Sequence, residues 1–125
     1  MYRDKIIILY LLLLMNHVAH ILEEIWGRMW LIDSIFGVGW FLLGNWVLFC
    51  VPAALFYFII NEKKWAYSLG MIYGAIMVVN GIGHNVATLL TGRYFGGFAG
   101  CYTGIGLIIV GGLLIYHLNK GIQLK

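Results

Sequence analysis

The sequence predicts an all-α integral membrane protein, built as an antiparallel up-down bundle of four transmembrane helices. Hydrophobic residues make up 62% of its 125 residues and charged residues only 10%, whereas a soluble domain carries about 25% charge. Four apolar stretches are each long enough to cross the hydrocarbon of a bilayer, which takes roughly 20 helical residues. We expect helices near 6–26, 35–60, 65–91 and 98–118, joined by short connections into a single membrane domain over residues 1–125.

Basic residues flank one end of the predicted bundle more heavily than the other. The termini and the 61–64 connection carry Arg3, Lys5, Lys63, Lys64, Lys120 and Lys125, and the opposite connections carry Arg28 and Arg93. Because basic flanks stay in the cytoplasm, we expect both termini on the cytoplasmic side of a bacterial-type inner membrane or a plasma membrane. The net charge of +3 is scattered over these flanks, so it does not indicate a nucleic-acid partner.

The end of the first helix is the most unusual segment of the sequence. The run 6–15 is almost wholly apolar, and two histidines and two carboxylates then follow within residues 17–24: His17, His20, Glu23 and Glu24. A charged carboxylate placed in hydrocarbon costs roughly 2.5–3.5 kcal/mol on insertion scales. A cluster of ionisable residues at this depth therefore indicates a functional site.

The cluster has a counterpart on the third helix. His20 and Glu24 are four residues apart and share one helix face, and Asn80 and His84 repeat that spacing. Counted from the basic flanks at Lys5 and Lys64, the two pairs lie at matching depths, since a helix rises about 1.5 Å per residue. We therefore expect these four side chains to converge between the first and third helices, near the outer face.

Histidine and carboxylate side chains suit zinc, iron or manganese, and three protein ligands beside an open position are typical of catalytic zinc. The candidate ligands of a divalent metal are His20, Glu24, His84 and His17. The candidate catalytic groups are Glu23, Glu24 and Tyr94, with Asn80 and Arg93 as substrate contacts or structural polar contacts.

Several functions are compatible with such a site. One is a metal-dependent hydrolase or oxidase acting on a lipid-like or amphiphilic substrate, and a second is a cofactor-free isomerase that moves a proton between His and Glu. The alternative is a non-catalytic small membrane subunit or binding module that uses the cluster for structural or metal-binding contacts. In a simpler arrangement, Glu24 pairs with Arg28 one turn away at the membrane surface. A cavity at the depth of His20 and His84 would favour an enzyme.

Glycines recur at helical spacing on the last two helices. Such stripes let helix backbones approach closely in lipid, and could also join the chain to a second copy or to a larger membrane complex. The glycines concerned are Gly70 and Gly74 on the third helix and Gly96, Gly100, Gly104 and Gly111 on the fourth.

Three short motifs resemble one known family. The segment His20-Ile21-Leu22-Glu23-Glu24 fits the signature of the HXXEE-domain proteins, which are small multi-helix membrane proteins. His84 matches a further histidine of that family, and Tyr94-Phe95-Gly96-Gly97 is similar to its Tyr-x-Pro-Gly motif, with Gly96 in place of the proline. The resemblance implies His20, Glu23, Glu24 and His84 as site residues. It implies no reaction, because the function of the family is not established.

Overall fold

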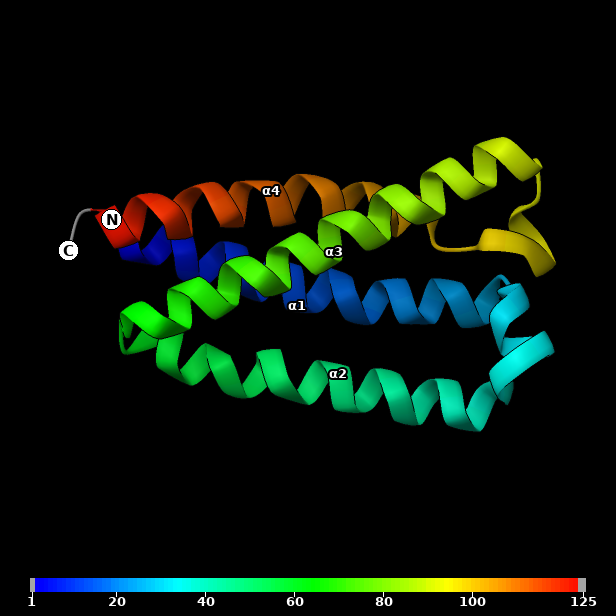
Figure 1. Ribbon diagram of the computed structural model, residues 1–125, viewed down its shortest axis with the longest axis horizontal. Helices are drawn as coiled ribbons and strands as arrows, with labels where there is room; N and C mark the ends of the chain where they lie inside the picture. The colour runs from blue at the N-terminus through cyan, green and yellow to red at the C-terminus, as the bar shows by residue number, and fades with distance from the viewer. Residues whose placement is uncertain (1, 124–125) are drawn as a thin grey trace.

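The computed structural model describes residues 2–123, and four long α-helices run along its length (Figure 1). They are α1 (Tyr2–Trp26), α2 (Gly37–Ile60), α3 (Lys64–Thr91) and α4 (Cys101–Gln123). Each is long and apolar enough to cross a membrane. The prediction of an all-α, four-helix, multi-pass membrane protein is therefore confirmed.

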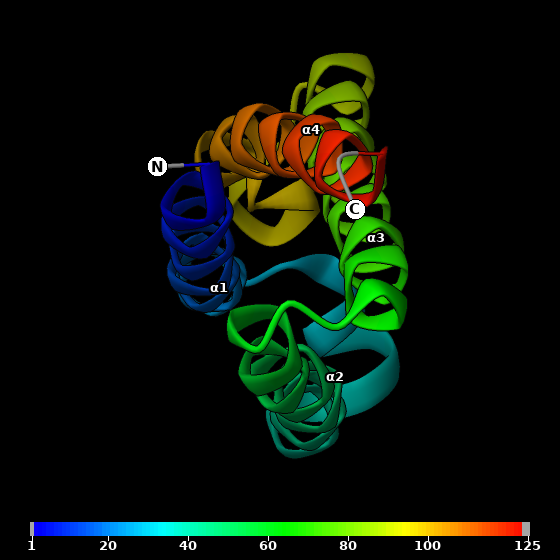
Figure 2. The same cartoon turned by 90° about the vertical axis from the view of Figure 1, so that its left-hand side faces the viewer.

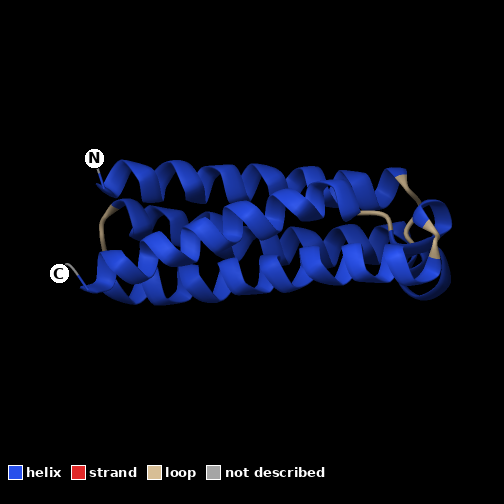
Figure 3. Cartoon of the chain, turned by 90° about the horizontal axis from the view of Figure 1, so that it is seen from above, coloured by secondary structure: helices blue, strands red, loops and turns tan. Residues whose placement is uncertain are grey.

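The two ends of the bundle differ in construction. Both termini and the tight turn between α2 and α3 lie at one end, and the longer α1–α2 and α3–α4 connections lie at the other (Figures 1 and 3). The α1–α2 connection contains a short π-helical turn, η1 (Ile32–Phe36). The α3–α4 connection contains η2 (Tyr94–Phe98), a kinked turn in which Phe95, Gly96 and Gly97 have non-helical backbone angles. The assignment of the termini to the cytoplasm stays a prediction from the basic residues.

Helix α4 is the centre of the packing. It packs most extensively against α3 and next against α1, whereas α2 lies on the far side of the bundle and contacts α1 and α3 less extensively (Figure 2). The buried apolar core lies mainly toward the termini and includes Ile6 and Tyr10 of α1, Tyr67 of α3 and Leu118 of α4. Helix α2 is therefore packed less tightly against the bundle than the other three helices.

Glycines explain the close contact of α3 with α4. A Cβ on Gly81 would collide with the carbonyl oxygen of Gly104, and a Cβ on Gly111 would lie 3.1 Å from the carbonyl oxygen of Gly74. Backbones that approach this closely leave no room for larger side chains. The predicted glycine face is thus used inside the chain, between α3 and α4.

Two of the glycines expected on the fourth helix lie outside it. Helix α4 begins at Cys101, whereas Gly96 has a φ of 66° and Gly100 a φ of 121°. Positive φ angles do not fit a right-handed helix and favour glycine, which has no Cβ. These residues belong to the connection that folds over the ends of α1 and α3.

Candidate metal centre

Three side chains from α1 and α3 meet at the end of the bundle opposite the termini. Nε2 of His84 lies 3.0 Å from Oε1 of Glu24, and Nε2 of His20 lies 3.6 Å from the same oxygen. The three residues are buried, and one ligand atom from each lies within 4.8 Å of the others. The predicted convergence of His20, Glu24 and His84 is confirmed.

Hydrogen bonds on the outer side of each ring decide which nitrogen carries the proton. The hydroxyl of Thr103 donates to the carboxylate of Glu23, so it accepts from Nδ1 of His20, 2.9 Å away. Nδ1 of His84 lies 3.3 Å from the carbonyl oxygen of Phe98, which can only accept. Both rings therefore carry the proton on Nδ1, and the bond at one ring nitrogen fixes the role of the other. In the neutral imidazoles, each Nε2 directs a lone pair at Glu24.

This arrangement brings three electron-pair donors together. Nε2 of His20 is buried and has no hydrogen-bond partner among residues 2–123, which is unfavourable unless a cation or a proton lies between the rings and Glu24. Two ligand atoms bound tetrahedrally to one zinc ion at about 2.0–2.1 Å are roughly 3.4 Å apart. The observed separations of 3.0 and 3.6 Å lie on either side of that value. The donor set therefore fits a divalent metal.

The carboxylate of Glu23 faces away from this group. It accepts hydrogen bonds from the backbone N–H groups of Tyr102 and Thr103, from the Thr103 hydroxyl and, at 2.7 Å, from the Tyr94 hydroxyl. Residues 102 and 103 are in the first turn of α4, where backbone N–H groups lack partners and negative charge is favoured. Glu23 therefore caps α4 from a neighbouring helix. These contacts hold the start of α4 against α1, and the catalytic role of Glu23 stays a prediction from the sequence.

A close-packed connection covers the two histidines. A Cβ on Gly100 would lie 2.7 Å from Cε1 of His20 and 2.7 Å from Nδ1 of His84. Nearby, the backbone N–H of Gly96 donates to the carbonyl oxygen of Gly27 at 2.8 Å, which fixes the connection to the end of α1. The backbone between α3 and α4 thus packs against both imidazole rings and restricts their positions.

His17 and Asn80 lie beside the cluster, outside the group of ligand atoms. Nδ1 of His17 is 3.1 Å from the hydroxyl of Tyr73, so this ring is engaged one turn before His20. Asn80 is half-buried and lines a cavity of about 390 Å³ together with His17, His20 and Glu24. The two residues predicted as a ligand and a polar contact therefore form part of the wall of a cavity beside the candidate metal centre.

Tyr94 and Arg93 differ in their relation to the site. Burial, followed by the hydrogen bond to Glu23, raises the pKa of the Tyr94 hydroxyl, so it remains a donor at neutral pH. Arg93 is exposed and lines a separate hollow near Trp30 and Thr91. Tyr94 supports the capping carboxylate, and the structure does not bring Arg93 to the candidate ligands.

The simpler surface pairing of Glu24 with Arg28 is not observed. Arg28 pairs with Asp33 in the α1–α2 connection, at 3.0 Å. Glu24 is only 5% exposed, and its carboxylate lies against His20 and His84. Its carboxylate therefore belongs to the buried cluster.

Comparison with protein-family models, with curated proteins and with solved structures gave no match to this chain.

The sequence reasoning missed the contribution of α4 and of the connection before it. Thr103, the Phe98 carbonyl and Gly100 all contact the histidines. Residues 96–100 are small or apolar, so the sequence predicts that the fourth helix begins near residue 98, and no polar residue there indicates a site. The Thr103 hydroxyl, close to the start of the fourth apolar stretch, is a polar group in the sequence that could have indicated this contact.

Proposed function

We propose that this protein is a membrane-embedded, metal-dependent enzyme acting on a lipid-like substrate, with His20, Glu24 and His84 as metal ligands. The observation that carries the proposal is the pair of imidazoles held by bonds at Nδ1, with both Nε2 atoms directed at one buried carboxylate. Histidines that bind metals typically donate their other N–H to a nearby oxygen in this way.

The donor set favours particular metals and reactions. Two histidines and one carboxylate hold zinc in several hydrolases, and also hold Fe(II) in oxygenases. Both sites keep a coordination position for water or substrate. Zinc bound here would supply a Lewis acid for hydrolysis, and iron would support oxidation. The chain's own residues hold the metal through Glu24 and the histidines, and Thr103 orients the His20 ring.

The cavity supports an enzyme over a purely structural subunit. His20 and Glu24 form part of the wall of the 390 Å³ cavity between α1, α2 and α3. A structural cluster would instead be closed off and would satisfy its own polar atoms, whereas Nε2 of His20 has no hydrogen-bond partner in the described part of the chain. A substrate entering from the bilayer between the helices could therefore reach the ligands.

Membership of the HXXEE-domain family is part of this proposal. Its support is the order of the motifs and the placement of His20, Glu24 and His84 in one buried group. Gly96 stands at the proline of the third motif and has a φ of 66°, which a proline ring cannot adopt. This connection therefore has a different backbone from that of a proline-containing relative, while Tyr94 keeps a contact with the Glu23 carboxylate.

A metal-free proton-transfer enzyme is the second candidate. The 3.0 Å separation of His84 and Glu24 suits a charge-assisted hydrogen bond. Such a pair could remove a proton from a substrate at one carbon and return it at another, as in an isomerase. Metal content separates the two candidates.

The test is the metal content of the purified full-length protein, measured beside His20→Ala, His84→Ala and Glu24→Gln. We expect one metal ion per chain in the wild type and loss of the metal in the three variants. His117→Gln is the matched control, because His117 lies at the other end of the bundle, beside Tyr2. A metal-free wild type that keeps activity would favour the isomerase, and metal retained by all variants would refute the assigned ligands.

A further inference from the structure

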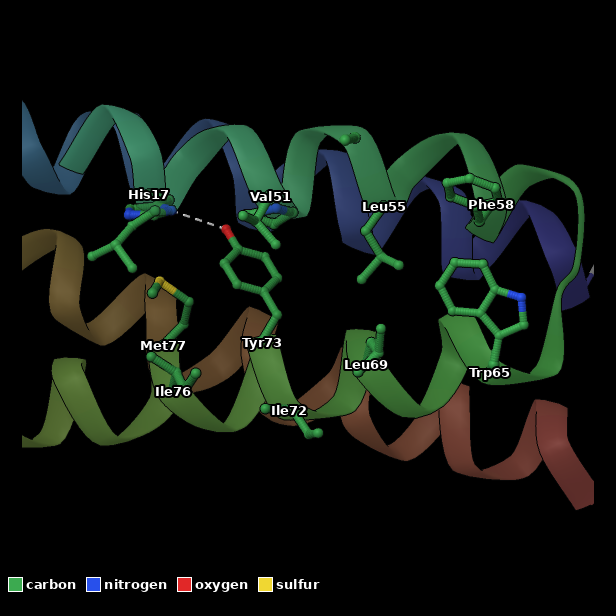
Figure 4. A pocket seen from close by; sticks show the side chains of 13 residues that line it. His17, Val51, Leu55, Phe58, Trp65, Leu69, Ile72, Tyr73, Ile76 and Met77 are labelled. Carbon is green, nitrogen blue, oxygen red and sulfur yellow. Dashed lines mark hydrogen bonds between the residues drawn. The ribbon is translucent and has the colours of Figure 1, made fainter. Parts of the chain in front are cut away.

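An apolar cavity of about 550 Å³ extends along the bundle from His17 toward Phe58 and Trp65, near the α2–α3 turn (Figure 4). It lies between α2 and α3. Val51, Leu55 and Phe58 of α2 face Leu69, Ile72 and Trp65 of α3 across it. The cavity follows the looser packing of α2, and it runs parallel to the helices and so to the acyl chains of a surrounding bilayer.

The wall of this cavity offers few unpaired polar groups to a ligand. His17 and Tyr73 belong to the lining, and their hydrogen bond to each other satisfies the Tyr73 hydroxyl and one ring nitrogen of His17 (Figure 4). The Trp65 indole lies at the far end, in the first turn of α3. The stretch between them is hydrocarbon, which suits an alkyl chain and excludes a polar molecule.

The apolar cavity adjoins the cavity at the metal centre. Four residues line both of them: His17, Leu48, Ile76 and Met77. These shared residues place the two cavities next to each other, and the second is also lined by His20, Glu24 and Asn80. One elongated molecule could thus lie in both, with a polar head at the ligands and an apolar tail beside α2.

We infer that the two cavities together bind a single-chain amphiphile, such as a long-chain fatty acyl compound, whose head carries an oxygen that can reach the metal. The inference rests on the proposed function for its polar end. Beyond the proposed function, it specifies the class of substrate and the cavity in which the alkyl chain of the substrate lies.

The dimensions fit one chain. Trp65 and Met77 are 12 residues apart, which is about 18 Å along a helix. A methylene group occupies about the volume of a water molecule, roughly 30 Å³ in the liquid, so a 550 Å³ cavity holds one long acyl chain and not two. Leu48, Val51, Leu69 and Ile72 are more than 40% exposed in the isolated chain, so the cavity is open sideways and the tail can enter from the lipid.

Photolabelling tests the inference without relying on turnover. The full-length protein is placed in phospholipid nanodiscs with palmitic acid that carries a diazirine on its chain, and the labelled residues are mapped by mass spectrometry. We expect labelling concentrated on the cavity wall, at residues such as Val51, Leu69 and Ile72, and its loss when unlabelled palmitic acid is in excess.

Two tryptophan variants sharpen this test. Ala54→Trp places a large ring in the cavity wall and should abolish the competed labelling. Ala75→Trp is the matched control, because Ala75 is exposed on α3 and lines neither cavity. Labelling that is spread over lipid-facing residues outside both cavities, such as Trp46 and Leu89, or that persists in Ala54→Trp, would overturn the inference.

Metal content of the same samples separates this inference from the proposed function. Ala54→Trp should keep the metal, which also shows that the bundle is folded. Cavity labelling in a protein that binds no metal would support the chain site and contradict the metalloenzyme. Bound metal with labelling only on the outer surface would leave the metalloenzyme in place and remove the acyl chain site.

Discussion

Oγ1 of Thr103 lies 2.9 Å from Nδ1 of His20 and joins the first turn of α4 to the candidate metal centre. The same hydroxyl donates to Glu23, so its remaining role toward the imidazole is that of acceptor. The carboxylate of Glu23 thereby fixes the tautomer of His20 without facing the cluster. Two adjacent glutamates serve the site differently: Glu24 faces the histidines, and Glu23 orients one of them through α4.

Replacing Thr103 should weaken metal binding while leaving the three ligands in place. Thr103→Val removes the acceptor at Nδ1 of His20, and loss of such a partner typically lowers metal affinity about 10–100-fold. Competition with a chromogenic chelator measures the change. Thr103→Ser keeps the hydroxyl and should restore most of the affinity. Equal weakening in both variants would mean that the hydroxyl does not orient the ring.

Exchanging each glutamate for glutamine should separate their roles. Glu23→Gln places an amide group opposite backbone N–H donors of α4, so we expect a loss of about 1–3 kcal/mol of stability with metal binding retained. Glu24→Gln should lose the metal. Thermal unfolding of the metal-depleted proteins measures the change in folding stability without the contribution of bound metal. The account is wrong if Glu23→Gln loses metal as completely as Glu24→Gln does.

Gly100→Ala should disrupt the site. The added Cβ would lie 2.7 Å from atoms of both His20 and His84, and the φ of 121° is itself unfavourable for alanine. We expect loss of metal and a lower unfolding temperature in detergent. Gly92→Ala is the control: it has a φ of 64° and open space around the new Cβ, so it should lose some stability and keep the metal. Metal retained in Gly100→Ala would show that the ring positions do not depend on this contact.

The four helices and the central residues of the site could be predicted from the sequence because both follow from regular helix geometry. Long apolar runs define the spans, and equal rise per residue places His84 at the depth of Glu24. The partners of the histidines could not be predicted in the same way. Thr103 and the Phe98 carbonyl reach the site through a connection whose path depends on the positive φ angles of Gly96 and Gly100.

The different orientations of the Glu23 and Glu24 carboxylates could not be predicted from the sequence either. Adjacent residues on a helix point about 100° apart, so one carboxylate faces His84 and the other faces the start of α4. Which direction each takes depends on where α4 lies, and α4 was expected to begin three residues too early. The partner of His17 could not be predicted either, because only the structure shows that the Tyr73 hydroxyl of α3 lies 3.1 Å from Nδ1 of His17.

The Tyr94 hydroxyl should give stability that depends on pH. Burial and the bond to Glu23 raise its pKa above the ordinary value of about 10. The stabilisation is fully present below that ordinary value and is lost as the pH rises from there through the folded-state pKa. Tyr94→Phe should therefore be less stable than wild type by about 1.5 kcal/mol near neutral pH, and the difference should narrow above about pH 10. Thermal unfolding across this pH range measures it.

Tyr102→Phe provides the control for this prediction, because the Tyr102 side chain is 71% exposed. Its stability should follow that of the wild type at each pH. If the difference in stability between Tyr94→Phe and the wild type stays constant above about pH 10, the Tyr94 hydroxyl does not stabilise the fold by donating a hydrogen bond to Glu23.

The most direct test of the metal centre is an anomalous-diffraction map of the metal-loaded protein, recorded at the absorption edge of the metal found in the purified sample. The account predicts one peak in each chain, about 2.0–2.2 Å from Nε2 of His20, Nε2 of His84 and a carboxylate oxygen of Glu24. A peak at any other group of residues, or no peak in a folded protein supplied with zinc, iron and manganese, would contradict it.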